Sequence, residues 1–364
     1  MSLTQAEAFA RIRLLRSPHI GPVSYRQLLG RFGTAEAAVT ALPDLARRGG
    51  RPYTATPADR VEREVAGVRR AGARYLFHDQ PDYPQLLAQA PAAPPILTMR
   101  GRLDLAARPC VALVGARNAS AAAVQLAREF GAALAAEGFA VVSGLARGID
   151  GAAHEGAFPH TVGVIASGID IAYPPQHRDL QERIATDGLL LAEQPVGTEP
   201  RGSHFPSRNR IIAGLSLGTL VVEAAPQSGS LITARLAGEY GREVMAIPGS
   251  PLEPRSAGAN ELIRDGAVLV QDPAQVAELL RRFDGTPRTA LAERQQAFIA
   301  LEEEPVDGPA GSDIATLMSP APVHVDELIR QSGQGTGAVQ MALLELEIAG
   351  RLVRHEGGRV SLAS

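Results

Sequence analysis

The sequence contains no lysine and no tryptophan, and it has a single cysteine, Cys110. One cysteine excludes an internal disulfide framework and any metal site built from a cluster of cysteines. Because Cys110 begins an apolar run, we interpret it as a core residue. Without lysine, all 36 basic side chains are arginines, so every anion site must use the guanidinium fork, which suits bidentate phosphate contacts.

Long apolar runs are also missing. No stretch of about 18 apolar residues exists, and the N-terminus lacks the apolar segment of a signal peptide, so we expect a cytoplasmic protein with no membrane contact. The 364 residues have the composition of a globular chain of two or three domains. The net charge of −3 conceals a basic N-terminal part, because residues 1–78 hold 13 arginines against six acids. Since the whole chain is not basic, nucleic-acid binding would depend on local patches.

The sequence divides into four segments. Residues 1–78 have apolar residues at helical spacing and predict a helical domain of the helix-hairpin-helix or SAM-like kind, with its hairpin around 20–23. Residues 79–284 alternate short apolar strands with helical segments, which predicts an α/β domain with a Rossmann-like, doubly wound parallel sheet. Residues 285–311 are polar, with Gly and Pro at both ends, and predict a linker. Residues 312–364 have the three helices and hairpin of a winged-helix domain.

The individual elements follow from the same periodicities. Strands are expected at 110–115, 139–144, 161–166, 188–193, 219–224 and 243–249. Helical segments are expected at 121–138, 147–158, 176–186, 207–217 and 229–240. In the last segment, Thr336 is the expected N-cap of the third helix and Gly350 its C′ residue, and the hairpin turns at Gly357 and Gly358.

Several enzyme classes are excluded by their missing motifs. The loop 115–120 lacks the G-x-G-x-x-G spacing, and the next strand ends in Ser143 with no acid for a ribose, which argues against a dinucleotide cofactor. A P-loop is impossible without lysine, and the histidines show no metal-ligand spacing. We therefore predict no catalytic residue, no cofactor and no metal. His154 is interpreted as a satisfied helix residue rather than a site residue.

The stretch FPSRNRIIAGL, residues 205–215, raises a different possibility. Ser207 can cap a helix, which would place Arg208 and Arg210 in its first turn, where positive charge costs roughly 0.3–1 kcal/mol each. Phe205 precedes them, and no acid lies between Arg201 and Arg210.

Two interpretations of this stretch remain open from the residues alone. Arginines beside an aromatic ring are suited to single-stranded nucleic acid, with guanidinium groups for phosphates and the ring for a base. Alternatively, Phe205 packs against the helix start and the two arginines pair with Glu193, Glu199 or Glu223.

Six motifs, in order, resemble the DprA/Smf family of DNA-processing proteins over residues 80–283. They are VALVGAR (111–117), VVSGLARGIDGAAHEGA (141–157), DIAYPPQHRDL (170–180), FPSRNRIIAGLS (205–216), SGSLITARLAGEYGR (228–242) and AIPGS followed by GANELIRDGA (246–267). The flanking segments resemble the helical N-terminal domain and the winged-helix tail of that family less specifically.

The resemblance implies a function without catalysis. Members of the family bind single-stranded DNA without sequence preference, form homodimers through the Rossmann-like domain, and help to load the RecA recombinase during natural transformation. The incoming DNA is covered by single-strand-binding protein, which is a further candidate partner. Carried onto this chain, the DNA-binding residues are Arg117, Ser143, Gly144, Arg201, Phe205, Arg208, Asn209, Arg210, Ser228 and Gly229. The backbone N–H groups around Gly144 are expected to be donors to DNA, and Leu262, Ile263 and Leu269 to lie at the dimer contact.

Two other functions are weighed against this one. The run PQSGSLITARLAGE resembles the P-G-G-x-G-T-x-x-E run of nucleoside-monophosphate phosphoribohydrolases, but its second Gly-Gly element is missing and its acid is displaced. A transcription regulator acting through residues 312–364 is the other alternative. The expected recognition helix carries Glu345 and Glu347 and no positive charge, so a protein contact is favoured over a DNA contact for this segment.

Overall fold

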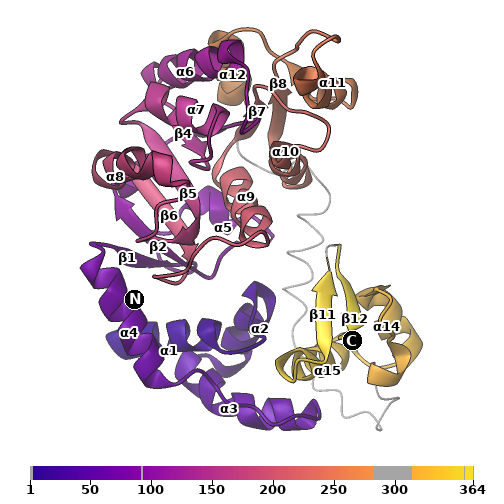
Figure 1. The fold of residues 1–364 in the computed structure, drawn as a ribbon. Helices are drawn as coiled ribbons and strands as arrows, with labels where there is room; N and C mark the ends of the chain where they lie inside the picture. The colour runs from indigo at the N-terminus through magenta and orange to yellow at the C-terminus, as the bar shows by residue number, and fades with distance from the viewer. Residues whose placement is uncertain (1–2, 92, 283–313, 356, 364) are drawn as a thin grey trace. The chain divides into compact units, whose positions relative to one another are not determined.

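The structure is a computed structural model that describes residues 3–91, 93–282, 314–355 and 357–363 (Figure 1). The described residues form two compact units. The first contains the residues up to Arg63 together with those from 314 onwards, and the second begins at Glu64. The predicted linker 285–311 lies outside the described residues. Among the described residues, no helix is long and apolar enough to cross a membrane.

The second unit is built on a nine-stranded sheet, in the order β1-β2-β6-β5-β4-β3-β7-β8-β9. In this spatial order, the seven neighbouring strands β6-β5-β4-β3-β7-β8-β9 pair in parallel. Strand β2 is antiparallel to both of its neighbours, β1 and β6. The strands are β1 (Arg74–Phe77), β2 (Ile96–Gly101), β3 (Cys110–Val114), β4 (Ala140–Ser143), β5 (Thr161–Gly168), β6 (Leu189–Gln194), β7 (Gly218–Val221), β8 (Glu243–Ala246) and β9 (Val268–Leu269).

Helices cover both faces of this sheet (Figure 1). The helices of this unit are α5 (Gln85–Ala88), α6 (Ala121–Ala136), α7 (Ile149–Ala157), α8 (Arg178–Asp187), α9 (His204–Leu215), α10 (Gly229–Glu239), α11 (Ala257–Arg264) and α12 (Pro273–Arg282). Along β3 the side chains alternate between two apolar clusters, Cys110 and Ala112 with α9 and α10, and Val111 and Leu113 with α6, α7 and α12. Burial on both faces explains why these strands are continuous apolar runs.

The predicted doubly wound fold is confirmed, with the predicted strands and helices in place. Cys110 is buried, as expected, and burial raises the pKa of its thiol to about 12. One stretch is corrected: Arg74–Phe77 falls in the segment expected to be helical but forms strand β1, at the edge of the sheet. Its four residues RYLF do not alternate between polar and apolar side chains, and the pairing with β2 decides their extended conformation.

The first unit contains α1 (Gln5–Arg16), α2 (Pro22–Phe32) and α3 (Ala35–Arg48), and α4 (Ala58–Arg70) contains the boundary between the units. Its C-terminal part has α14 (Val325–Ser332), α15 (Thr336–Ile348) and a small sheet of β10 (Val323–His324), β11 (Leu352–His355) and β12 (Arg359–Leu362). The predicted first helix of the winged domain is a short 3-10 helix, Ile314–Leu317.

Predicted caps and turns in the winged domain are partly right. The N-cap of α15 is Gly335 rather than Thr336, because Thr336 already has helical geometry. Gly350 follows the C-cap residue with a φ of 66°, as predicted, and Gly357 and Gly358 have φ of 72° and 69° between β11 and β12. Two consecutive left-handed residues match the tight hairpin expected there.

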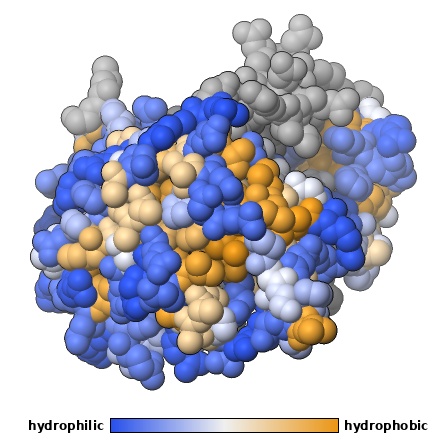
Figure 2. Space-filling model, turned by 90° about the horizontal axis from the view of Figure 1, so that it is seen from above, coloured by the Kyte–Doolittle hydropathy of each residue, from blue (hydrophilic) through white to orange (hydrophobic). Residues whose placement is uncertain are grey.

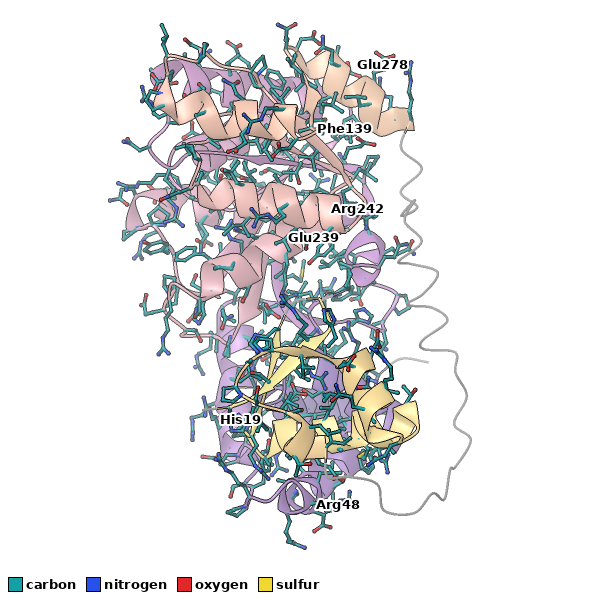
Figure 3. All side chains as sticks on the ribbon, turned by 90° about the vertical axis from the view of Figure 1, so that its right-hand side faces the viewer. His19, Arg48, Phe139, Glu239, Arg242 and Glu278 are labelled. Atoms are coloured by element: carbon teal, nitrogen blue, oxygen red, sulfur yellow. The ribbon has the colours of Figure 1, made fainter. Side chains whose placement is uncertain are left out.

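Most of the molecular surface seen in Figure 2 is hydrophilic, with apolar side chains gathered into a patch between polar ones. Figure 3 labels side chains of the second unit, among them Glu239, Arg242 and Glu278. Arg242 is among the buried arginines of the described residues, and its Nη2 donates to the carbonyl of Leu86, which ties the turn between α10 and β8 to α5.

Candidate nucleic-acid interface

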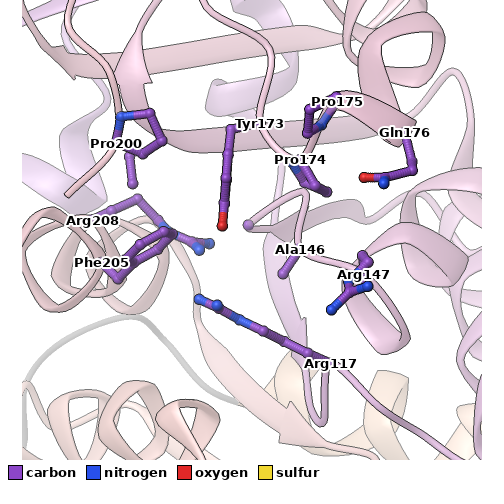
Figure 4. A pocket seen from close by; sticks show the side chains of 12 residues that line it. Arg117, Ala146, Arg147, Tyr173, Pro174, Pro175, Gln176, Pro200, Phe205 and Arg208 are labelled. Atoms are coloured by element: carbon purple, nitrogen blue, oxygen red, sulfur yellow. The ribbon is translucent and has the colours of Figure 1, made fainter. Parts of the chain in front are cut away.

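A pocket of about 180 Å³ opens at the carboxyl ends of β3, β4 and β5, beside helix α9 (Figure 4). In a doubly wound sheet the loops after parallel strands converge at this edge, and ligands bind there. Among the described residues that line the pocket, three are arginines and none is acidic. The lining residues are Arg117, Gly144, Ala146, Arg147, Ala166, Tyr173, Pro174, Pro175, Gln176, Pro200, Phe205 and Arg208.

Two aromatic rings and an arginine form one side of the pocket. The ring centres of Tyr173 and Phe205 are 5.9 Å apart and inclined by 53°. The guanidinium carbon of Arg117 lies 4.7 Å from the centre of the Phe205 ring. In Figure 4 the Tyr173 hydroxyl points into the pocket and Arg117 reaches across its mouth. A ring that carries a cation on its face presents stacking surface and positive charge together.

Arg208 lies at the base of the pocket and is only 6% exposed. Its closest anion is Asp150, which is equally buried, with 3.9 Å between Nη1 of Arg208 and Oδ2 of Asp150. Burial lowers the pKa of the Arg208 guanidinium, and the Asp150 carboxylate opposes that change. Burial likewise raises the pKa of Asp150, against the effect of Arg208. We assign the pair as ionised, because each charge offsets the cost of burying the other.

The loop after β4 does not offer its N–H groups to the pocket as expected. The N–H groups of Gly144 and Ala146 point to Oδ2 of Asp150, at 3.2 and 3.4 Å. That of Leu145 donates to Nε2 of His154 at 3.3 Å. These donors are engaged inside the protein in this structure, and the expectation that the loop supplies backbone donors to DNA stays a prediction.

Gly144 has a different reason to be glycine. A Cβ atom at this position would lie 1.1 Å from Nη1 of Arg208. The missing side chain is the space that the guanidinium occupies, so Gly144 lines the pocket through its contact with Arg208.

His154 is a satisfied helix residue, as predicted. It is fully buried, and its Nδ1 lies 2.7 Å from Oγ1 of Thr161, whose hydroxyl donates to the carbonyl of Val141. Nδ1 therefore carries the proton, and Nε2 accepts from Leu145. Burial, together with the positive charges of His177 and Arg208, lowers the pKa of His154 to about 3. The neutral ring holds Leu145 at a φ of 56°, in the left-handed region.

The start of α9 also differs from expectation. The helix begins at His204, and Ser207 lies inside it, donating to the carbonyl of Ser203 instead of capping. Arg208 and Arg210 consequently lie beyond the first turn, where the dipole cost is small. Arg210 pairs with Glu193, so one of the alternative ion pairs is present, whereas Arg208 pairs with an acid that was not considered.

The other predicted DNA-binding residues lie outside the pocket lining. Ser143 donates to the carbonyl of Leu113, and Asn209 to that of Gly229, so both are tied into the fold. The remaining ones are Arg201, which is exposed, Arg210, and Ser228 and Gly229 at the start of α10. Ser228 caps α10 by accepting from the N–H of Ser230.

Three polar lining residues were not predicted: Arg147, Tyr173 and Gln176. Tyr173 is 42% exposed and Arg147 is exposed. The available signal was that all three fall in loops directly after strands β4 and β5, within motifs that had been noted. What a sequence cannot supply is the direction in which each of these side chains points.

Comparison with known proteins identifies the family. A sequence model described as DNA recombination-mediator protein A matches residues 74–281. The chain belongs to the DprA/Smf family. The DprA-like N-terminal HHH domain matches residues 5–67, and the DprA winged helix domain matches residues 284–358.

Several DprA/Smf relatives resemble most of the chain. Protein Smf of Synechocystis is 36% identical, covering 79% of each chain, and Protein Smf of Escherichia coli is 33% identical, covering 90% of this chain and 87% of its own. The crystal structure of DprA from Streptococcus pneumoniae superposes with a TM-score of 0.64 at 35% identity, covering 78% of this chain and 99% of that one. DprA from Helicobacter pylori, whose structure is described as giving insights into a unique single-stranded DNA binding mode, superposes with a TM-score of 0.53 at 30% identity, covering 58% and 98%.

Proposed function

We propose that this chain binds single-stranded DNA, without sequence preference, in the pocket at the carboxyl edge of its sheet. The observation that carries the proposal is the grouping of Arg117, Arg147 and Arg208 with the rings of Phe205 and Tyr173 around a pocket that no described acidic residue lines. Guanidinium groups bind phosphates bidentately, and aromatic faces stack on any base.

Each side chain has a distinct task in this proposal. Arg117 and Arg147 are exposed and have no ion pair among the described residues, so their charge is available at the pocket mouth. Phe205 and Tyr173 provide surfaces for bases, and Arg208 provides a charge at the base of the pocket. None of these contacts distinguishes one base from another, which is why the binding ignores sequence.

The relatives support the same function, since a DprA structure from Helicobacter pylori is described by its single-stranded DNA binding mode. In keeping with the DprA/Smf family, we propose that the bound strand is passed to the RecA recombinase during natural transformation, in the cytoplasm and without catalysis by this chain. Single-strand-binding protein covers such incoming DNA, and we propose it as a further partner of this chain.

A homodimer is part of the proposal. Leu262 and Ile263 on α11 are partly buried against the sheet core, and Leu269 on the edge strand β9 is 46% exposed. Leu252, in the loop before α11, is 91% exposed. An edge strand with exposed leucines beside it is suited to a second copy of the same chain.

The proposal is tested by the salt dependence of oligo-dT binding. If about three phosphates are neutralised per chain, the logarithm of the affinity falls against the logarithm of salt concentration with a slope of roughly −2. Arg117→Ala should weaken binding to all sequences alike and make the slope shallower by roughly one contact. Arg282→Ala, which removes the same charge from an exposed ion pair on α12, is the matched control. Binding that ignores salt, or that favours duplex tenfold, would contradict the proposal.

Phe205 separates a base contact from a packing role. Phe205→Leu keeps an apolar side chain beside α9 but removes the ring. We expect it to weaken oligo-dT binding about tenfold, in the lower part of the stacking range of roughly 1–3 kcal/mol, with unchanged thermal stability. Unchanged binding with lowered stability would instead assign Phe205 to packing.

The two alternative functions gain no support from the site. Thr233 and Glu239 of the phosphoribohydrolase-like run lie on α10, with Thr233 buried and neither lining the pocket. Release of adenine from AMP by the purified protein would favour that enzyme. In the winged domain, Leu344 and Ile348 of α15 pack in the apolar cluster of the helical domain, so the helix expected to read DNA has a partner within the chain.

A further inference from the structure

Arg208 is a buried cation with unused hydrogen-bonding capacity. Its Nε is buried without a hydrogen-bond partner, and its ion pair with Asp150 has a separation of 3.9 Å, which is too long for a hydrogen bond. A buried polar group without a partner is costly and rare in native proteins, and it calls for an explanation such as a ligand.

Arg210, on the same helix, shows the contrast. Its Nη2 donates directly to Oε1 of Glu193, so its charge is already bound by a carboxylate. Arg208 also faces a carboxylate, that of Asp150, but this carboxylate accepts hydrogen bonds from two backbone N–H groups and none from Arg208. The two arginines are two positions apart, and only Arg208 lines the pocket.

The Asp150 oxygen closest to Arg208 is held in place by backbone groups. This atom, Oδ2, accepts from the N–H groups of Gly144 and Ala146, at the start of the loop that leads to α7. Asp150 is itself in the first turn of α7, where a negative charge is favourable. The carboxylate thus joins the loop after β4 to the helix, and it places a negative charge 3.9 Å from the guanidinium.

Gly144 makes room for the guanidinium of Arg208, and we call this space the seat of Arg208. Nη1 of Arg208 can lie against Gly144 only because glycine has no Cβ, since a Cβ there would be 1.1 Å from Nη1. Gly144 does not have a positive φ, so an alanine here would be compatible with the backbone and would act only on Arg208.

We propose that Asp150 and Gly144 are positioning residues for DNA binding, which hold the guanidinium of Arg208 in the pocket with its hydrogen-bond donors free for one phosphate. The proposal rests on the proposed function and assigns the phosphate contact at the base of the pocket. Asp150 attracts and orients the guanidinium without consuming its donors, because its own oxygen is engaged by the loop. Such pre-organisation lowers the cost of ordering the side chain when the ligand binds.

Gly144→Ala tests the seat. The new methyl group displaces the guanidinium while the number of charges stays the same, and we expect oligo-dT affinity to fall about tenfold or more, as for a lost charged hydrogen bond. In a double-mutant cycle, Gly144→Ala should have little further effect once Arg208→Gln is present. Gly238→Ala in α10, where a Cβ meets only an ordinary contact at 3.7 Å, is the matched control.

Asp150→Asn tests whether Asp150 orients the guanidinium of Arg208, because the two explanations predict opposite changes in DNA affinity. The amide oxygen still accepts from the loop, but the variant is one charge more positive. Simple electrostatics predicts tighter DNA binding, whereas loss of positioning predicts weaker binding. We expect at least about fivefold weaker binding at equal salt, with a salt slope no steeper than that of the parent chain.

The outcomes separate this inference from the proposed function. If the parent chain binds oligo-dT and Arg117→Ala weakens it, but Gly144→Ala binds normally or adds independently to Arg208→Gln, the positioning role is overturned and the function stands. Tighter binding by Asp150→Asn also overturns the role of Asp150. A parent chain that does not bind oligo-dT overturns both. Should Asp150→Asn fail to fold, Gly144→Ala still decides the matter.

Discussion

At the scale of single residues, the pocket depends on how buried polar groups are paired. Asp150, His154 and Arg208 are all buried, and each is held by a different partner: backbone N–H groups, a threonine hydroxyl and a carboxylate. Two of these residues, Asp150 and His154, accept the N–H groups of the loop 144–146 and so tie this part of the pocket wall to α7. The side chains at the mouth, Arg117 and Tyr173, are exposed and contact the ring of Phe205.

The buried His154 predicts a pH dependence of stability. Its pKa is about 3 in the folded protein against 6.5 in an unfolded chain. Between these values the unfolded chain binds the extra proton, so stability falls as the pH drops below 6.5, by about 1.4 kcal/mol per pH unit from this residue. His154→Gln keeps both hydrogen-bonding functions and removes the titration. Urea unfolding at pH 7.5 and pH 5 should show a drop that is about 2 kcal/mol larger for the parent chain than for the variant. An equal drop in both would contradict this assignment.

At the scale of elements, helix α15 shows how packing changes the role expected from a motif. Its apolar residues Leu344 and Ile348 join the cluster formed by α1, α2 and α3. Arg48, labelled in Figure 3, pairs with Glu345 at 2.8 Å, and the backbone of Gly49 approaches the Glu345 carbonyl so closely that a Cβ would be 2.1 Å from it. The second acidic residue of this helix, Glu347, accepts a hydrogen bond from Arg354. Both glutamates that argue against DNA binding by α15 are therefore paired with arginines of the same chain.

This packing predicts that α15 and the helical domain share their stability. Leu344→Ala removes a buried side chain from the shared cluster and should cost about 2–5 kcal/mol. Thermal unfolding followed by limited proteolysis should show the helical residues and the winged domain becoming sensitive together. Val353→Ala, at a position that is 43% exposed, is the control and should change little. Loss of the winged domain alone would show that the two parts are independent.

At the scale of the whole molecule, the nine-stranded sheet sets where partners can bind. Its carboxyl edge holds the pocket, while β9 leaves one side of the sheet unpaired among the described residues. A dimer across β9 would bring two pockets into one assembly, and one strand of DNA could then contact both. Such linkage raises the overall affinity through the effective concentration of the second site.

Leu269→Asp tests the proposed dimer. A charge at this exposed leucine of the edge strand should shift the chain from dimer to monomer in sedimentation velocity and weaken binding to long oligo-dT more than to short oligo-dT. Val23→Asp, at a similarly exposed residue of the first unit, is the matched control. A parent chain that sediments as a monomer at micromolar concentration would contradict the proposed dimer.

Sequence motifs predicted part of the site, because a motif shows where a residue lies along the chain but not where its side chain points. Arg117, Gly144, Phe205 and Arg208 fall in motifs, and the structure brings them together at one pocket. Ser143 and Asn209 fall in the same motifs but act within the fold. Sequence spacing does not distinguish these cases, because a loop residue can face either the pocket or the core.

The sequence by itself determined the sheet, its alternating helices and the positions of the loops, because continuous apolar runs can be buried only between two layers of helices. It also determined that the long basic side chains at the pocket are arginines, because the chain contains no lysine. Tertiary structure alone decided that Asp150 faces Arg208, that the N–H groups of residues 144–146 are already engaged, and that Tyr173 joins the pocket. These pairings link residues from different strands and helices, and burial sets their strength, which no local pattern records.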